Sequence, residues 1–231
     1  MSEYYIIDNW YESPNNIRDL AIDSLNKNSE IGREKQFGLR AFPGYRTNCP
    51  LNNLLINKEK IEKETNLKID PKRWIFQQTI NLNQTDYDFL EYDFDTNELK
   101  IKNSDLVICD DNTISNGSFQ YCTKDSKTWV HADKRNDYAA VVYLHPNPPS
   151  RCGTAFYKHK RSKKTHEQYY DFIPVDEILN PKCWEEIDYV ENVYNRCVIY
   201  NAKQFHTATG YFGDIPENSR LFQVFFFNIL S

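Results

Sequence analysis

The spacing of apolar residues divides the chain into a helical first part and a β-rich second part. Ser13 followed by Pro14 is typical of a helix start, with a capping residue before a proline at the first helical position. Apolar residues at helical spacing follow, which predicts an amphipathic helix over residues 14–27 and a second helix over residues 51–64. We therefore expect residues 1–70 to form a helical layer that packs against the rest of the chain.

From Trp74 onwards the apolar residues recur in short runs that polar turns separate. With one run at the N-terminus, the segments that we predict as strands are 4–8, 75–82, 119–122, 128–131, 137–144, 153–157, 195–200 and 221–229. Residues 83–118 show only short strand-like pieces, around 99–101 and 106–108. Residues 159–185 are a polar insertion with a short helix near 175–179.

Short strands joined by long loops favour a jelly roll or a small barrel. The length of 231 residues suits one domain with a proper core, and the aromatic content of 15% with only 7 glycines favours β-rich faces. The expected fold is mainly β with N-terminal helices (α+β). Residues 1–231 form a single domain, in which residues 74–231 make a double-stranded β-helix (jelly-roll, cupin-like) core.

Composition and charge argue against nucleic acid and membranes as partners. The net charge of −5 provides no global field that would attract nucleic acid. The basic run His159–Lys164 is interpreted as a solvated loop. The six cysteines form no CxxC pair, the N-terminus lacks the features of a signal peptide, and no apolar run approaches the ~20 residues of a membrane span. We predict a cytoplasmic protein with reduced thiols and neither nucleic-acid nor membrane partners.

The first candidate for chemistry is the pair His131 and Asp133, together with His206 far downstream. Residues i and i+2 of a strand point to the same face, so His131 and Asp133 can reach one metal ion if they lie at a strand end. Two imidazoles and one carboxylate occupy one face of an octahedral ion and leave the other face open. The alternative is a strand-end histidine that merely bonds a nearby aspartate.

Arg220 lies after His206 and opens the last apolar strand. An arginine inside a barrel needs an anion, because a buried guanidinium without a partner is costly. Its planar fork matches a carboxylate. Arg46 ends a turn predicted at residues 42–46 and is interpreted as a surface arginine, with a substrate contact as the alternative.

In these features the chain resembles the 2-oxoglutarate and iron(II)-dependent dioxygenases, most closely their prolyl-hydroxylase-like branch. The resemblance covers residues 119–229. It rests on His131-Ala132-Asp133, the strand that ends Val142-Tyr143-Leu144, the segment Gly153-Thr154-Ala155-Phe156, His206 and Arg220.

The resemblance implies that His131, Asp133 and His206 bind Fe(II), and that Arg220 pairs with the distal carboxylate of the co-substrate 2-oxoglutarate. Tyr143 matches a tyrosine that helps to hold this carboxylate, with a plain core aromatic as the alternative. Tyr121 matches a position near the co-substrate in some relatives. The implied reaction consumes O2, releases succinate and CO2, and hydroxylates a C–H bond; ascorbate is a further candidate cofactor.

Two departures from the family pattern stand out. The segment between His206 and Arg220 is longer than in compact members, and Gly153 supplies only one of the two glycines that often precede the Thr-x-Phe element. The other histidines, at positions 145, 159 and 166, are not expected to be ligands. His159 and His166 lie in the polar insertion, where exposure is the default.

Three functions stay open from the sequence. The first is a hydroxylase of a peptide, a protein or a small molecule. The second is a cupin-like protein that binds metal without turnover. The third is a zinc hydrolase, which would give Arg220 no role. The insertion 159–185 and the loop 207–219 are expected to frame the entrance. The oligomeric state stays open, with a homodimer among the alternatives.

Overall fold

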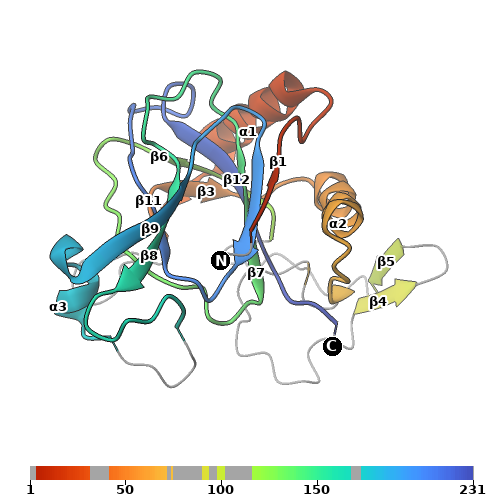
Figure 1. Ribbon diagram of the computed structural model, residues 1–231. Helices are drawn as coiled ribbons and strands as arrows, with labels where there is room; N and C mark the ends of the chain where they lie inside the picture. Colours follow the sequence, from red (N-terminus) through yellow and green to blue (C-terminus); the bar gives the residue numbers. More distant parts are fainter. Residues whose placement is uncertain are drawn as a thin grey trace.

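Two antiparallel β-sheets face each other at the centre of the computed structural model (Figure 1). The structure describes residues 4–31, 42–71, 74, 90–93, 98–101, 116–167 and 173–230. The strands are β1 (Tyr4–Ile7), β2 (Glu30–Ile31), β3 (Tyr45–Thr47), β4 (Leu90–Asp93), β5 (Glu98–Ile101), β6 (Ser118–Cys122), β7 (Tyr138–Tyr143), β8 (Thr154–His159), β9 (Trp184–Val190), β10 (Cys197–Asn201), β11 (His206–Ala208) and β12 (Arg220–Phe227). The helices are α1 (Pro14–Asn28), α2 (Leu51–Thr65), the short α3 (Val175–Ile178) and a 3-10 turn at Pro181–Cys183.

The larger sheet has seven strands in the order β1-β10-β7-β12-β6-β3-β2, and the smaller sheet has the order β11-β8-β9. Strands β4 and β5 form a separate pair. Each pairing is antiparallel. The fold is thus a mainly β sandwich with few helices, as the alternation of apolar residues predicted.

Strand β12 shows how the larger sheet separates two cores. Leu221, Phe225 and Phe227 pack in the core that includes the helices, whereas Phe222 and Val224 pack in the core that includes the smaller sheet. This is the alternation that a strand buried on both faces requires. The functional side chains described below lie on the face that is turned toward the smaller sheet.

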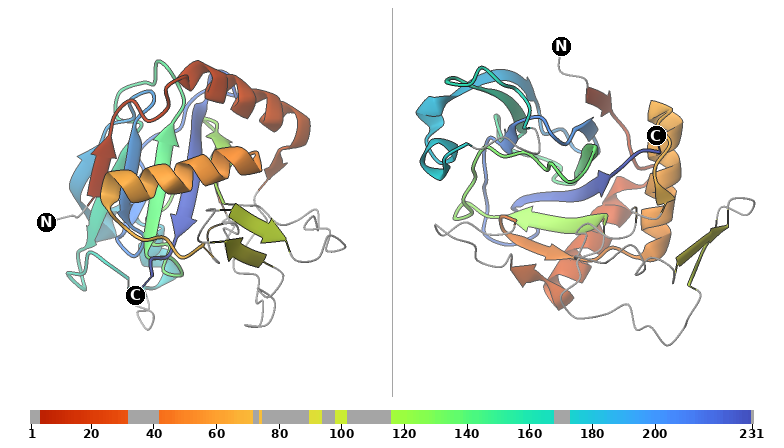
Figure 2. Two further views of the ribbon diagram at one scale, coloured as in Figure 1. Left: turned by 90° about the vertical axis from the view of Figure 1, so that its right-hand side faces the viewer. Right: turned by 90° about the horizontal axis from the view of Figure 1, so that it is seen from below.

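Helices α1 and α2 cover the other face of the larger sheet, and α2 runs across its strands (Figure 2). Ala21 and Leu25 of α1 and Leu54 and Ile61 of α2 are buried in this core. Both helices were predicted within one residue at each end. The predicted side-chain cap at Ser13 is wrong, because Ser13 contributes only its carbonyl group, which accepts from the amide of Asn16.

Three expectations need correction. Residues 1–70 are not only a helical layer, because β1, β2 and β3 belong to the larger sheet. Residues 128–131 form no strand but a single bridge at His131. Strand β9 was missed because its first residues fall in the predicted polar insertion and its exposed residues, such as Glu185 and Glu186, hide the apolar pattern of a strand. The strands expected at 75–82 and around 106–108 lie outside the described residues.

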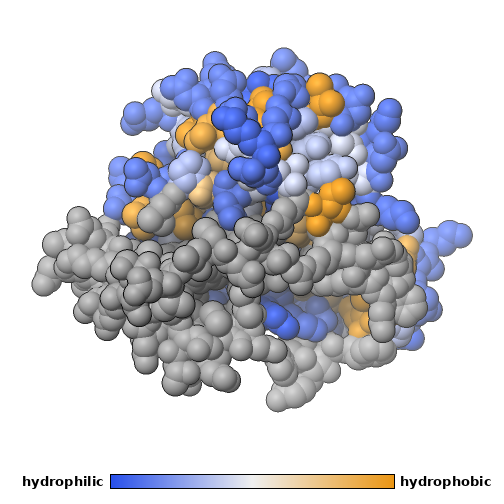
Figure 3. Space-filling model, turned by 180° about the vertical axis from the view of Figure 1, so that it is seen from behind, coloured by the Kyte–Doolittle hydropathy of each residue, from blue (hydrophilic) through white to orange (hydrophobic). Residues whose placement is uncertain are grey.

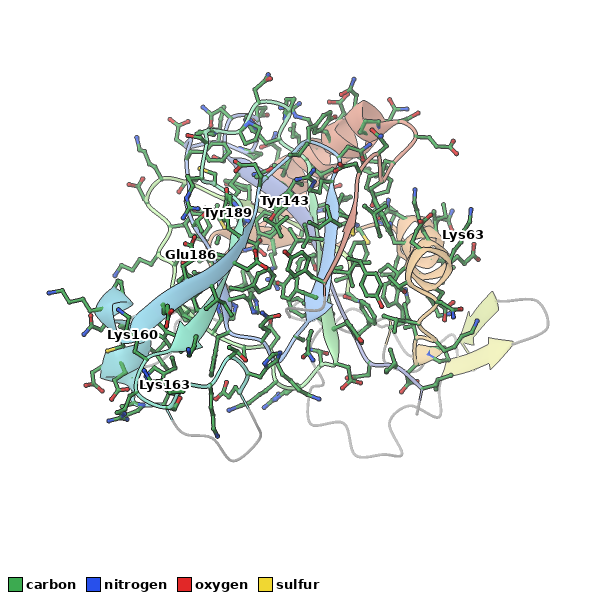
Figure 4. All side chains as sticks on the ribbon, in the orientation of Figure 1. Lys63, Tyr143, Lys160, Lys163, Glu186 and Tyr189 are labelled. Atoms are coloured by element: carbon green, nitrogen blue, oxygen red, sulfur yellow. The ribbon has the colours of Figure 1, made fainter. Side chains whose placement is uncertain are left out.

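The described surface is mixed in character. In the view from behind, exposed hydrophobic side chains stand in small groups among hydrophilic ones (Figure 3). None of the helices in the described ranges combines the length and the hydrophobicity that a bilayer span requires. Lys160 and Lys163 of the basic run lie at the periphery, near α3 (Figure 4). This position agrees with a solvated loop.

Candidate metal centre

The structure brings together the three side chains that were predicted to bind a metal. His206 begins β11 in the smaller sheet, and His131 forms an isolated antiparallel bridge with it. Asp133 follows two residues after His131. Its backbone amide donates a hydrogen bond of 2.7 Å to the carbonyl of Ala202. The side chains of His131, Asp133 and His206 offer ligand atoms that all lie within 4.8 Å of one another.

Backbone carbonyl groups orient both imidazole rings. Nδ1 of His131 lies 3.0 Å from the carbonyl oxygen of Trp129, and Nδ1 of His206 lies 2.8 Å from that of Gln204. An Nδ1–H that donates to a carbonyl leaves the lone pair on Nε2, which is how metal-binding histidines are usually held. The two rings therefore present Nε2 as the ligand atom.

The donor set fits a divalent ion. Nε2 of His206 lies 3.3 Å from Oδ2 of Asp133, and ligands about 2.1 Å from one ion lie about 3 Å apart in adjacent positions. Nitrogen and carboxylate donors in a two-histidine, one-carboxylate set are typical of non-haem Fe(II), although Zn²⁺ also accepts them. His131, Asp133 and His206 are thus the residues that would hold the metal.

The electrostatics of the site favour the protonation states that a metal needs. Burial and the neighbouring His206 lower the pKa of His131, which keeps this ring neutral near pH 7. Burial tends to raise the pKa of Asp133, but the hydrogen bond with His206 and the positive charges nearby outweigh it, so this pKa lies below its usual value. The neutral ring of His131 and the ionised carboxylate of Asp133 can bind a cation without first losing a proton, whereas a metal has to displace the proton that Nε2 of His206 donates to Asp133.

These ligands line a cavity of about 80 Å³ between the two sheets, which is room for several water molecules or a small organic acid. Apolar and aromatic side chains make up much of the wall. The residues around the cavity are Pro43, Arg46, Gln120, His131, Asp133, Val141, Thr154, Tyr200, His206, Ala208, Tyr211, Arg220, Phe222, Val224 and Phe226. None of the described residues from 159 to 185 is among them, whereas the loop after His206 contributes Ala208 and Tyr211.

Arg220 lies in the same cavity and is only 3% exposed. Its Nε donates to the carbonyl of Cys152 at 3.1 Å, and one terminal nitrogen donates to the carbonyl of Gly153 at 3.3 Å. The guanidinium carbon lies 4.8 Å from the ring centre of Phe222 and 5.5 Å from that of Tyr143. These contacts fix a positive charge in a largely apolar wall, and two carbonyl groups do not neutralise that charge.

Tyr143 ends β7 and is fully buried in the interior of the sandwich (Figure 4). Its hydroxyl forms a 2.7 Å hydrogen bond with Oγ1 of Thr154, and Thr154 itself lines the cavity. Burial raises the pKa of Tyr143, so the phenol stays protonated. Tyr143 thus contacts Arg220 and Thr154 but does not itself line the cavity. Thr154 was part of the segment Gly153-Thr154-Ala155-Phe156 that the resemblance used, but no role was predicted for it.

Tyr121 is placed away from the cavity. It faces Leu221 across the β6–β12 pair, and its ring stacks on Tyr45 with centres 4.9 Å apart. Both belong to the core that includes the helices. The neighbours Gln120 and Cys122 point to the other face of β6, so the expected contact of Tyr121 with a co-substrate has no support in this arrangement.

Two further residues correct the sequence interpretation. Arg46 is not a surface arginine: it is 9% exposed and lines the cavity, with Nε donating to Oε1 of Gln120. His159 is not exposed either. It is 1% exposed, and its ring nitrogens meet Ser162 at 2.9 Å and Glu177 at 2.8 Å. His159 lies outside the cavity and ties the basic loop to α3.

No family model and no curated protein matches the sequence. Among solved structures, the chain is similar to a prolyl-4-hydroxylase from Pseudomonas putida, with 10% sequence identity and a TM-score of 0.44. The match covers 100% of this chain and 95% of that one. A likeness this distant assigns no function, and the proposal below therefore rests on the side chains in the cavity.

Proposed function

We propose that the protein is a non-haem Fe(II) and 2-oxoglutarate-dependent oxygenase that hydroxylates a C–H bond of a peptide, a protein or a small molecule. One observation carries the proposal: the cluster of His131, Asp133 and His206 shares a cavity with the buried cation Arg220. A metal site alone would also suit a hydrolase or a binding protein. A fixed arginine in the same cavity provides the second anchor that a dicarboxylic co-substrate requires.

The topology supports the double-stranded β-helix core that such enzymes use. From β6 onwards the chain passes repeatedly from one sheet to the other: β6, β7, β10 and β12 lie in the larger sheet, and β8, β9 and β11 lie in the smaller one. Through its bridge with His206, His131 lies beside β11, where a fourth strand of the smaller sheet would run. His131 and His206 then lie side by side at this bridge, and Asp133 follows two residues after His131.

The chain's own residues have distinct tasks in this proposal. His131, Asp133 and His206 would hold the metal, and Arg220 would bind the distal carboxylate of 2-oxoglutarate. Tyr143 and Thr154 fix the wall beside Arg220. When bound, Fe(II) supplies the redox chemistry by which O2 and 2-oxoglutarate become succinate and CO2 and one oxygen atom enters the substrate's C–H bond. The apolar wall around Phe222 and Val224 excludes water from the reacting groups.

The test is succinate formation. Metal-free protein is loaded with Fe(II) and 2-oxoglutarate without oxygen, then exposed to air with ascorbate present, and succinate is measured with and without a cell extract. We expect slow succinate formation by the wild type and none by Asp133→Ala. A protein that binds Fe(II) tightly but forms no succinate under any condition would instead be a metal-binding protein without turnover. Mass spectrometry of the extract, read for a gain of one oxygen, then identifies the substrate.

A further inference from the structure

Tyr200 is a buried tyrosine in the cavity wall, and its hydroxyl group has no hydrogen-bond partner in the described part of the chain. The residue lies on β10, is 3% exposed and is one of the residues that line the cavity. None of the hydrogen bonds among the described residues involves the hydroxyl of Tyr200. Buried polar groups almost always have a partner, so a free hydroxyl at the cavity wall indicates a bound molecule.

The surroundings of Tyr200 place it beside the metal ligands. Its ring meets the ring of His206 edge to face, with the ring centres 4.7 Å apart, and a second edge contact of 5.3 Å joins it to Phe156. Burial and the carboxylate of Asp133 raise the pKa of Tyr200, whereas Arg220 lowers it. The hydroxyl group thus lies within electrostatic range of both charged side chains. A phenol is protonated near pH 7, so this hydroxyl is able to donate a hydrogen bond.

The other tyrosines at or near the cavity are engaged elsewhere. The hydroxyl of Tyr143 is bonded to Thr154, and Tyr143 does not itself line the cavity. The phenol of Tyr211 lines the cavity but has side-chain partners of its own. Tyr121 belongs to the core that includes the helices. Among the described residues that line the cavity, Tyr200 is therefore the tyrosine with a hydroxyl free to bind a ligand.

We propose that Tyr200 is a further binding residue for the co-substrate, and that its hydroxyl donates a hydrogen bond to the 2-oxo acid end of 2-oxoglutarate. The inference rests on the proposed function and adds a residue to the same site. The 2-oxo acid end is the one that the metal binds, and the ring of Tyr200 packs on the metal ligand His206. Arg220 holds the opposite end of the molecule. The oxygen atoms of a 2-oxo acid are acceptors, and a protonated phenol supplies the donor that they need.

The experiment compares two 2-oxo acids on the Co(II)-substituted protein without oxygen. 2-Oxoglutarate carries the 2-oxo acid end and the distal carboxylate, whereas pyruvate carries only the 2-oxo acid end. Isothermal titration and the Co(II) absorption bands measure both affinities. We expect Tyr200→Phe to weaken both acids by the same factor, about five- to tenfold, as for the loss of one hydrogen bond. Arg220→Gln should weaken 2-oxoglutarate alone. Tyr194→Phe is the matched control, because the hydroxyl of Tyr194 bonds Asn15 at the surface.

A structural role for the hydroxyl would give a different result. Tyr200→Phe removes a group without a partner among the described residues, so the Co(II) affinity and the urea denaturation midpoint of the ligand-free protein should match the wild type. A lowered midpoint would assign the hydroxyl to the fold and overturn the inference.

The affinities separate the remaining outcomes. Unchanged affinity of Tyr200→Phe for both acids overturns the inference, and so does a loss confined to 2-oxoglutarate, which would place the hydroxyl at the distal carboxylate. A larger loss in Tyr143→Phe than in Tyr200→Phe would return the role to Tyr143. If the wild type binds Co(II) but neither acid, the proposed function itself is contradicted.

Discussion

His131 and His206 exchange two backbone hydrogen bonds: the amide of His131 donates to the carbonyl of His206 at 3.0 Å, and the reverse bond measures 2.9 Å. This bridge joins two segments that are distant in the sequence at the positions where their side chains must meet. The ring centres lie 4.5 Å apart. The spacing of the two imidazoles is therefore built into the backbone, and metal binding need not order the segments first.

Removal of the Asp133 carboxylate beside these rings should weaken metal binding strongly. Asp133→Ala leaves the bridge from His131 to His206 in place but takes away the anionic ligand, so we expect the affinity for Fe(II) or Co(II) to fall by at least about tenfold. Titration followed by Co(II) absorption measures the change. His145→Gln is the control, because this histidine packs against Phe212 and does not line the cavity. Equal affinities in Asp133→Ala and the wild type would exclude Asp133 as a ligand.

Metal affinity should resist mild acid. The pKa of His131 and the pKa of Asp133 are both lowered in the folded protein, so protons compete with the metal only at a lower pH than for ordinary side chains. We expect the Co(II) affinity to be flat above about pH 6.5, the usual value for histidine, and to fall only below it. An NMR titration of the metal-free protein measures His131 directly, and a His131 pKa at or above the usual value of about 6.5 would contradict the expectation. In the metal-free protein, acid should also lower the free energy of unfolding, because His131 and Asp133 bind protons more readily in the unfolded chain.

Arg220→Ala should separate co-substrate binding from metal binding. Charge-assisted hydrogen bonds contribute about 1.5–3 kcal/mol, so the affinity for 2-oxoglutarate should drop by roughly 10- to 100-fold while the Co(II) affinity changes little. Isothermal titration of the Co(II) protein without oxygen measures both. Arg151→Ala is the matched control, since Arg151 pairs with Glu186 at the surface. An unchanged affinity for 2-oxoglutarate would remove Arg220 from this role.

The sequence predicted elements well where local periodicity decides the structure, as in α1, α2, β7 and β12. Strand spacing indicated that His131 and Asp133 share a face, and the resemblance to the dioxygenases implied His206 as the third ligand. The sequence did not reveal where two side chains, those of Tyr121 and Arg46, lie in the fold. Tyr121 differs from Gln120 by one position, and in a strand one position decides which core a side chain enters. Arg46 read as a surface residue because only the pairing of β3 with β6 buries it.

Gly44 should be needed for the approach of β3 to β6. It has φ of +71°, and an added Cβ would lie 2.1 Å from the carbonyl oxygen of Tyr121. Gly44→Ala should therefore destabilise the fold by more than about 1 kcal/mol, which urea denaturation measures. Gly44→Asn tests the cause, because asparagine tolerates positive φ but still carries a Cβ. Stability restored in Gly44→Asn would mean that backbone conformation, rather than the close approach, sets the requirement.

The helices should unfold together with the sandwich if the chain is one domain, as the sequence predicts. Ile61 of α2 is fully buried in the core between the helices and the larger sheet, whereas Ile56 of the same helix is 60% exposed. Ile61→Ala should lower the free energy of unfolding by about 2–5 kcal/mol, because it removes apolar contacts and leaves a cavity. Ile56→Ala should change it by no more than about 0.5 kcal/mol. Helical circular dichroism and the near-ultraviolet signal of the aromatic residues should report one shared transition in both variants, and in Ile61→Ala both signals should shift together. Loss of the helical signal before the aromatic one would show that residues 1–70 fold separately from the core that carries the metal centre.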